Sequence, residues 1–215
     1  MKQLFTMSDG GRLNRVKLVV LGGDNCGKTA LCVRFITKRF IGEYDHKKEV
    51  TYKCQRVVDK EAIDLEILDT ISKCLGPTAN TLESYIKWGD GFLIMYSVTD
   101  RNTFLCISNL KKQVDHFKQT FGTPIAIVAN KSDMENGRVV RTEEGQALAN
   151  ELRCAFYELS VAEDWTVVDS AMTQLVLEVK LAFHKQQMAM DKRSRMLQVG
   201  YALKNKLTRS KTMQW

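Results

Sequence analysis

A strand-like apolar run near the start of the chain leads directly into a glycine-rich loop. Residues 16–21 (VKLVVL) are followed by Gly22-Gly23-Asp24-Asn25-Cys26-Gly27-Lys28-Thr29, the pattern G-x-x-x-x-G-K-[ST], and then by a helix-forming segment. The glycines let the backbone curl so that its N–H groups point at phosphate oxygens. Lys28 adds a positive charge, the Thr29 hydroxyl can bind Mg²⁺, and the positive end of the following helix faces the anion. We therefore predict a phosphate-binding loop.

The rest of the pattern alternates short apolar runs with amphipathic segments, which is typical of an α/β domain. We expect strands at residues 16–21, 52–58, 62–68, 92–98, 125–129 and 155–159. We expect helices at residues 28–38, 81–88, 102–120, 142–152 and from 167 onward. The second and third strands are close enough for a hairpin, which predicts one antiparallel edge of the sheet.

Composition bounds the class of protein. The 215 residues suit one domain of ordinary size, and 44% of them are hydrophobic. The longest apolar run is too short to span a bilayer, and the N-terminus does not resemble a signal peptide. Six cysteines occur with no C-x-x-C pair, which argues against a zinc site or a disulfide framework and fits a reducing cytosol.

The net charge of +7 is concentrated at the C-terminal end. Residues 185–215 hold eight Lys or Arg and one acid, so the first 184 residues are neutral overall. We predict a short N-terminal extension (1–14), a folded domain (15–184) and a basic, mobile tail (185–215). The tail can remain solvated, lie on anionic lipid, bind a partner groove or act as a nuclear address. No nucleic-acid partner is expected, since the domain shows no basic patch.

A second motif, Asn130-Lys131-Ser132-Asp133, follows the expected strand at 125–129. The Asp133 carboxylate can accept hydrogen bonds from the ring N–H and the exocyclic amine of guanine, which adenine does not offer together. The aliphatic stem of Lys131 can cover one face of the base. Together with the phosphate loop, this motif indicates a guanine nucleotide and disfavours a P-loop kinase of small substrates.

With these motifs the chain resembles the Ras-like small GTPases over roughly residues 16–184. The resemblance includes GGDNCGKTAL, LEILDT, IVANKSD, TEEGQALA and CAFYELS. The stretches KRFIGEYD and WGDGF, and the absence of a C-terminal prenylation box, are most similar to the Ras-related estrogen-regulated growth inhibitor group. The resemblance implies an α/β P-loop NTPase fold, the Ras-like G domain. Its six-stranded, mostly parallel sheet has one antiparallel edge strand and helices on both faces.

The resemblance also implies a set of nucleotide contacts. Phe40 stacks on the guanine, Ser160 and Val161 back the base, and Asp69 holds Mg²⁺ through a water, with Thr29 as the other metal ligand. The expected nucleotide-binding residues are Gly22, Gly23, Asp24, Asn25, Cys26, Gly27, Lys28, Thr29, Ala30, Phe40, Asp69, Asn130, Lys131, Asp133, Ser160 and Val161. Mg²⁺ and GTP or GDP are the expected cofactor and ligand. Ala162 replaces a family lysine, which weakens the base pocket slightly.

Three positions depart from the family where its chemistry occurs. Lys47 takes the place of the threonine that binds Mg²⁺ and closes on the γ-phosphate, and an ammonium has no lone pair for a metal. Ser72 replaces the glycine whose N–H contacts that phosphate. Lys73 replaces the glutamine that orients the attacking water, and a protonated lysine only donates. We name no catalytic residue and expect slow hydrolysis.

Asp24 and Asn25 also stand where Ras proteins carry glycine. A side chain at position 24 excludes a partner's arginine finger, unless it only points to solvent. The sequence therefore predicts a monomeric signalling GTPase in the cytoplasm, with a nuclear location as a second possibility, that binds effectors and regulators through residues 42–52 and 69–80. The alternative is an interaction scaffold that lacks hydrolysis.

Overall fold

The computed structural model describes residues 7–8, 12–42, 48–71, 79–118 and 122–211. Its centre is a six-stranded sheet in the order β4-β5-β3-β6-β7-β8. The strands are β3 (Arg15–Gly22), β4 (Val50–Val58), β5 (Glu61–Asp69), β6 (Gly91–Ser97), β7 (Ile125–Asn130) and β8 (Ala155–Leu159). Only β4 runs antiparallel to its neighbour, with Val50 opposite Asp69 and Val58 opposite Glu61. The sheet is therefore mostly parallel with one antiparallel edge, as the sequence predicted.

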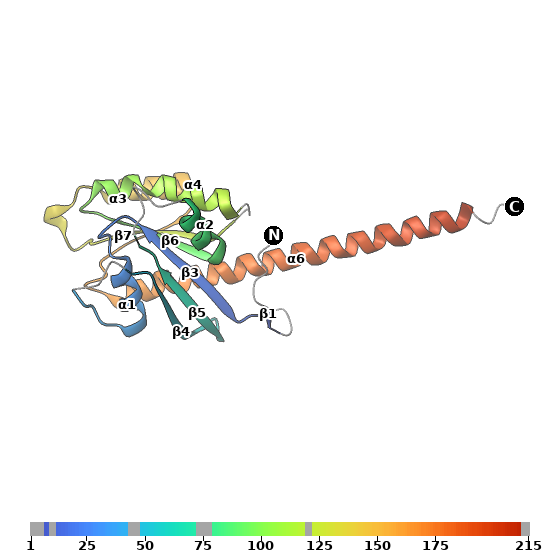
Figure 1. Cartoon of the computed structure of the whole chain (residues 1–215), viewed down its shortest axis with the longest axis horizontal. Coiled ribbons are helices and arrows are strands. Elements are labelled where there is room, and N and C mark those ends of the chain that lie inside the picture. Colours follow the sequence, from blue (N-terminus) through green and yellow to red (C-terminus); the bar gives the residue numbers. More distant parts are fainter. Residues whose placement is uncertain (1–6, 9–11, 43–47, 72–78, 119–121, 212–215) are drawn as a thin grey trace.

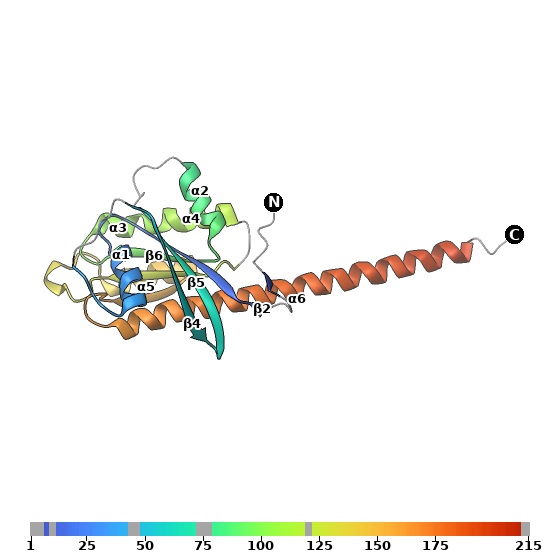
Figure 2. The same cartoon turned by 60° about the horizontal axis from the view of Figure 1, so that its bottom comes forward.

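Helices cover both faces of this sheet (Figures 1 and 2). One face carries α1 (Lys28–Thr37) and α6 (Trp165–Lys211), and the other carries α2 (Ala79–Trp88), α3 (Arg101–Leu105), α4 (Ile107–Lys118) and α5 (Thr142–Leu152). The shorter elements are η1 (Glu135–Gly137) and the strand pair β1 (Met7–Ser8) and β2 (Arg12–Leu13).

Two apolar cores follow from the alternation of side chains along β3. Leu18 and Val20 pack toward α1 and α6, whereas Val19 and Leu21 pack toward α2 and α4. The neighbouring strands β6 and β7 are buried along their whole length, as expected for parallel strands with helices on both sides. These interior strands provide a rigid support for the loops that follow them.

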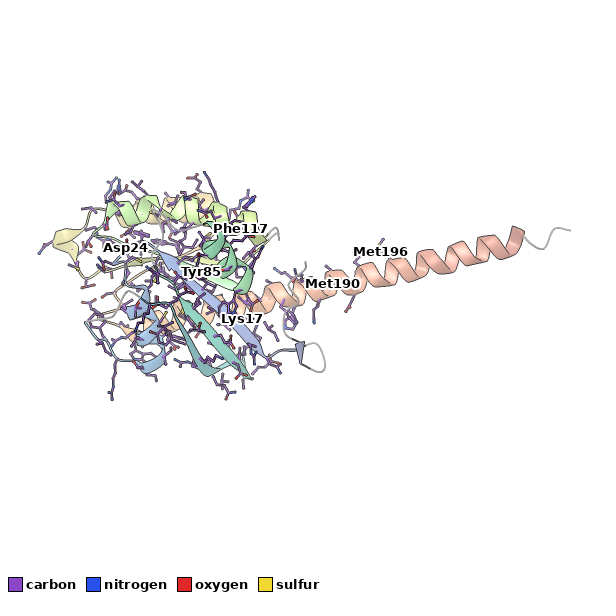
Figure 3. All side chains as sticks on the ribbon, viewed as in Figure 1. Lys17, Asp24, Tyr85, Phe117, Met190 and Met196 are labelled. Atoms are coloured by element: carbon purple, nitrogen blue, oxygen red, sulfur yellow. The ribbon has the colours of Figure 1, made fainter. Side chains whose placement is uncertain are left out.

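Helix α6 is much longer than the domain requires. Among the side chains of α6 that the structure describes, Phe183 is the last buried one, and beyond this residue the helix projects away from the sheet (Figure 1). Figure 3 shows Met190 and Met196 on the projecting part, where they are 50% and 69% exposed. The helix crosses the predicted boundary at 184/185 without a break, and a mobile tail stays a prediction. Within the described residues, no helix combines the length and apolarity needed to cross a membrane.

The predicted elements agree with the observed ones, and the short elements β1, β2 and η1 were not predicted. The helix expected at 102–120 corresponds to α3 and α4, which only Cys106 separates. Cys106 keeps helical dihedral angles, and its N–H donates to the Asn102 carbonyl at 3.3 Å. The Phe104 ring of α3 packs edge-on against Tyr96 with centroids 5.1 Å apart.

Candidate functional site

The predicted site residues lie at one edge of the sheet. Strands β3, β5, β6, β7 and β8 are parallel, so their carboxyl ends meet at the same edge. The phosphate loop (residues 22–29) follows β3, Asp69 ends β5, and Asn130 ends β7. Ser160 follows the last residue of β8. The carboxyl edge of a parallel sheet is the usual ligand-binding position in open α/β folds.

Close packing favours glycine in the phosphate loop, as Gly22 and Gly27 show. A Cβ added at Gly22 would lie 2.3 Å from the Met95 carbonyl oxygen, and one at Gly27 would lie 2.2 Å from Asn130 Nδ2. Gly27 also has φ = 96°, a left-handed conformation that favours glycine. The glycines of the motif therefore fit both the curl of the loop and its contacts with β6 and β7.

Lys28 is the first residue of α1 and is only 8% exposed. Its Nζ donates to the carbonyl oxygens of Gly23 at 2.8 Å and Gly22 at 3.2 Å. The ammonium is thus held inside the curl of the loop, at the positive end of the helix. An ammonium in this position favours an anion such as a phosphate.

Asn130 connects the two motifs. Its Nδ2 donates to the Cys26 carbonyl oxygen at 2.8 Å, and its Oδ1 accepts from the Val161 N–H at 3.1 Å. The Asn130 side chain is 3% exposed, so both hydrogen bonds are shielded from water. The phosphate loop, the NKSD loop and the loop after β8 therefore form one unit.

Asp69 is the last residue of β5, and Thr29 is the second residue of α1. Asp69 is 3% exposed, and Thr29 is half-buried. Burial raises the pKa of the Cys32 thiol well above its ordinary value; the charge of Asp69 raises it further and that of Lys28 lowers it. The charges of Asp69 and Lys28 therefore shift the pKa of Cys32, a residue of α1, in opposite directions. A carboxylate and a hydroxyl are oxygen ligands of the kind that Mg²⁺ prefers.

The predicted base-binding residues lie around the NKSD loop. The Ser132 N–H donates to the Leu159 carbonyl at 3.3 Å, while Asp133 is exposed and able to accept from a ligand. Buried Ser160 accepts from the N–H groups of Ala162 at 3.2 Å and Glu163 at 3.3 Å, which fixes the turn after β8. Lys131 is half-buried with φ = 69°. Burial raises the pKa of the Cys26 thiol, and the positive charges of Lys28 and Lys131 oppose this rise.

The remaining predicted residues are either exposed at the rim of the site or buried beneath it. Phe40 is 45% exposed, and Asp24 and Asn25 are exposed at the tip of the phosphate loop. Figure 3 shows Asp24 at the end of the molecule opposite the projecting part of α6. Ala30 and Cys26 are buried, so their side chains serve packing, whereas their backbone belongs to the loop and to the first turn of α1. Lys47, Ser72 and Lys73 lie outside the described residues.

Two contacts near the site were not predicted. The Thr70 hydroxyl donates to the Val20 carbonyl at 2.7 Å, which ties the end of β5 to β3. The Tyr85 hydroxyl of α2 donates to Glu49 before β4, and burial together with this carboxylate raises the pKa of Tyr85. The sequence signal available for Thr70 was its position directly after Asp69, the aspartate that ends β5. No local signal connects Glu49 with Tyr85, which is far along the chain.

Comparison with known proteins gives consistent matches. The model of the Ras family matches residues 17–181. The human Ras-related and estrogen-regulated growth inhibitor is 41% identical over 167 residues, 77% of this chain and 81% of that protein. The zebrafish Ras-like protein family member 11B is 36% identical over 76% of this chain and 69% of its own length. The mouse GTP-binding protein Rit1 is 35% identical over 83% of this chain and 80% of its own length.

Proposed function

The chain belongs to the Ras family of small GTPases, and we propose that it is a signalling switch that binds GTP and GDP with Mg²⁺ and hydrolyses GTP slowly. One observation carries the binding part of this proposal. Asn130 bonds both to the phosphate loop and to the loop after β8, so the phosphate-binding and base-binding segments are held in one fixed arrangement.

The residues of the loop fit a nucleotide phosphate. Gly27 leaves room only for backbone, and the ammonium of Lys28 is already oriented by two loop carbonyls. Lys28 would neutralise charge on the β- and γ-phosphates, and Thr29 and Asp69 would hold Mg²⁺. The metal would supply further neutralisation of the phosphate oxygens when bound.

Guanine selection rests on the exposed carboxylate of Asp133. It would accept two hydrogen bonds from the base, with the stem of Lys131 and the ring of Phe40 stacking on its faces. Ser160 and Val161 would close the pocket from behind. The Val161 N–H also donates to Asn130, so movement at the base pocket would reach the phosphate loop through one side chain.

Slow hydrolysis is proposed from residue types alone. Lys47 and Lys73 stand where the family uses a metal-binding threonine and a water-orienting glutamine. Neither ammonium accepts a hydrogen bond, so neither can bind the metal or take a proton from water. We expect a basal rate at or below about 10⁻⁴ s⁻¹, the intrinsic scale of Ras proteins, with little activation by a partner.

The proposed partners bind at two places. Effectors and regulators would contact residues 42–52 and 69–80, next to the exposed side chains of Phe40 and Ile41. The basic residues after 184 would contact an anionic membrane surface or an acidic partner, and this attraction would weaken with added salt. We expect the chain to act as a monomer.

Two measurements on the purified chain test the function. Mass spectrometry should find stoichiometric GTP or GDP, which Lys28→Ala should lose and the exposed control Lys112→Ala should retain. Because Lys28 is buried, Asp133→Asn provides a second variant at an exposed position. It should lose guanine nucleotide, and its thermal midpoint should equal that of the wild-type chain stripped of nucleotide. A wild-type chain that carries no nucleotide would favour the interaction scaffold.

Single-turnover hydrolysis tests the rate. We expect about 10⁻⁴ s⁻¹ or less, both alone and with a Ras-type activating protein. An increase of several thousandfold on adding the activator would refute slow hydrolysis and leave nucleotide binding intact.

A further inference from the structure

Gly23 of the phosphate loop has no room for a side chain, although the motif allows any residue at this position. A Cβ added there would lie 2.6 Å from Thr103 Cγ2, 2.9 Å from Thr103 Cβ and 3.2 Å from Thr103 Cα. Real Cβ contacts essentially never fall below 3.0 Å, so part of the loop or of α3 would have to move. Thr103 therefore packs closely on the loop backbone from α3.

Thr103 cannot rotate away from this contact. Its Oγ1 accepts from the Ser97 N–H at 3.0 Å and donates to the Asp100 carbonyl at 2.7 Å. A threonine in a helix divides between two χ1 rotamers, and these two hydrogen bonds hold Thr103 in one of them. Thr103 is only 4% exposed, and the Asp100 side chain caps α3 by accepting from the Asn102 N–H at 2.9 Å. The methyl group is thus held against Gly23 by the hydroxyl on the same carbon.

The Gly23 backbone lies between Thr103 and the site lysine. Its carbonyl oxygen is the nearer of the two that hold the Lys28 ammonium, at 2.8 Å. A displacement of Gly23 away from Thr103 would move this carbonyl and the ammonium bound to it. Because the loop N–H groups share the same backbone, their direction would change as well.

We propose that Thr103 is a positioning residue of the phosphate loop: its methyl group sets the Gly23 backbone, whose carbonyl places the Lys28 ammonium for the nucleotide phosphates. This inference rests on the proposed nucleotide binding. Thr103 does not touch the ligand. It fixes the loop before the ligand arrives, which reduces the ordering that binding would otherwise require.

A double-mutant cycle with fluorescent GDP tests the contact. Gly23→Ala should release GDP at least tenfold faster than wild type, because the new Cβ displaces the loop. Thr103→Ser removes the closest atom and keeps the hydroxyl, so adding it to Gly23→Ala should slow release again by threefold or more. Gly137→Ala is the matched control, since its added Cβ would meet Thr99 Cγ2 at an ordinary 3.5 Å.

The ratio of GMP to GDP affinity separates positioning from general damage. GMP lacks the β-phosphate that Lys28 would contact, so Gly23→Ala should weaken GDP binding tenfold or more while GMP binding in competition changes less than threefold. The inference would be overturned if Gly23→Ala weakened GDP and GMP binding equally, or if it released GDP at a rate within twofold of that of Gly137→Ala. The proposed function would stand in either case. A wild-type chain that binds neither GDP nor GTP would overturn both.

Discussion

The most demanding test of the site is the single-atom substitution Asn130→Asp. The shape of the side chain is preserved, and one oxygen can still accept from the Val161 N–H. The other oxygen replaces Nδ2, which now donates to the Cys26 carbonyl at 2.8 Å. Two acceptors would then face each other at a position that is 3% exposed. The substitution therefore removes one donor and introduces a repulsion, without creating a cavity.

The magnitude follows from this geometry. A buried acceptor left without its donor costs about 1–3 kcal/mol, and a charged neighbour adds to this. We expect a loss of about 3 kcal/mol in the free energy of unfolding. For a chain of this size the corresponding fall in thermal midpoint is about 6–12 °C. The control Asn150→Asp adds the same charge at an exposed position of α5, where the side-chain oxygen still accepts from Gln146.

The pH dependence of this loss gives an independent check. Burial and the facing carbonyl both disfavour the ionised form, so the pKa of the introduced carboxyl at position 130 should be raised above the unfolded value of about 3.9. The deficit relative to wild type should then be smallest below about pH 4 and grow as pH rises toward the folded pKa. Thermal unfolding at a fixed excess of GDP and Mg²⁺ measures both effects. A midpoint within 2 °C of the Asn150→Asp control would refute the connecting role of Asn130.

Two further predictions concern charged groups outside the site. Lys180 Nζ lies 2.8 Å from Glu61 Oε2, so Lys180→Met should lower the free energy of unfolding by about 1 kcal/mol because Glu61 can partly rehydrate. The exposed Lys185→Met on the same helix should stay within about 0.5 kcal/mol in urea titrations. Burial raises the pKa of Asp90, which accepts from the Lys17 N–H at 2.9 Å, so its contribution to stability is lost as pH rises through the acidic range. Asp90→Asn keeps this acceptor and should lose less stability than wild type as pH rises above about 4, and an equal loss would contradict the assignment.

Much of the fold could be predicted because local and long-range signals agree. The run at 16–21 leads into the glycines of the loop, and Thr142 with two following acids marks the start of α5, where Glu144 accepts from the Arg141 N–H at 3.0 Å. The hairpin of β4 and β5 was predictable from its short turn, where Asp59 and Lys60 adopt positive φ. These features depend on neighbours in sequence, which the sequence displays directly.

The features that could not be predicted depend on residues far apart in the chain. Asn130 was a predicted site residue, but its bond to Cys26 joins positions 104 residues apart. Thr103 was not named at all, since only the packing of α3 on the loop shows that it limits Gly23. The length of α6 likewise lacks a local signal, since the helix passes the predicted boundary at 184/185 and continues to Lys211.

In the proposed function, nucleotide binding and GTP hydrolysis depend on different residues. The phosphate loop is fixed by interior contacts: the Met95 carbonyl packs on Gly22, Thr103 packs on Gly23, and the Asn130 amide lies over Gly27. Each of these residues belongs to a strand or helix of the core, so losing the loop geometry would also cost stability. The proposed slow hydrolysis follows instead from the residue types at positions 47 and 73, which are not among these three contacts. In the proposed function, a substitution that disturbs the loop should therefore lower both nucleotide affinity and stability, whereas the two lysines should lower only the hydrolysis rate.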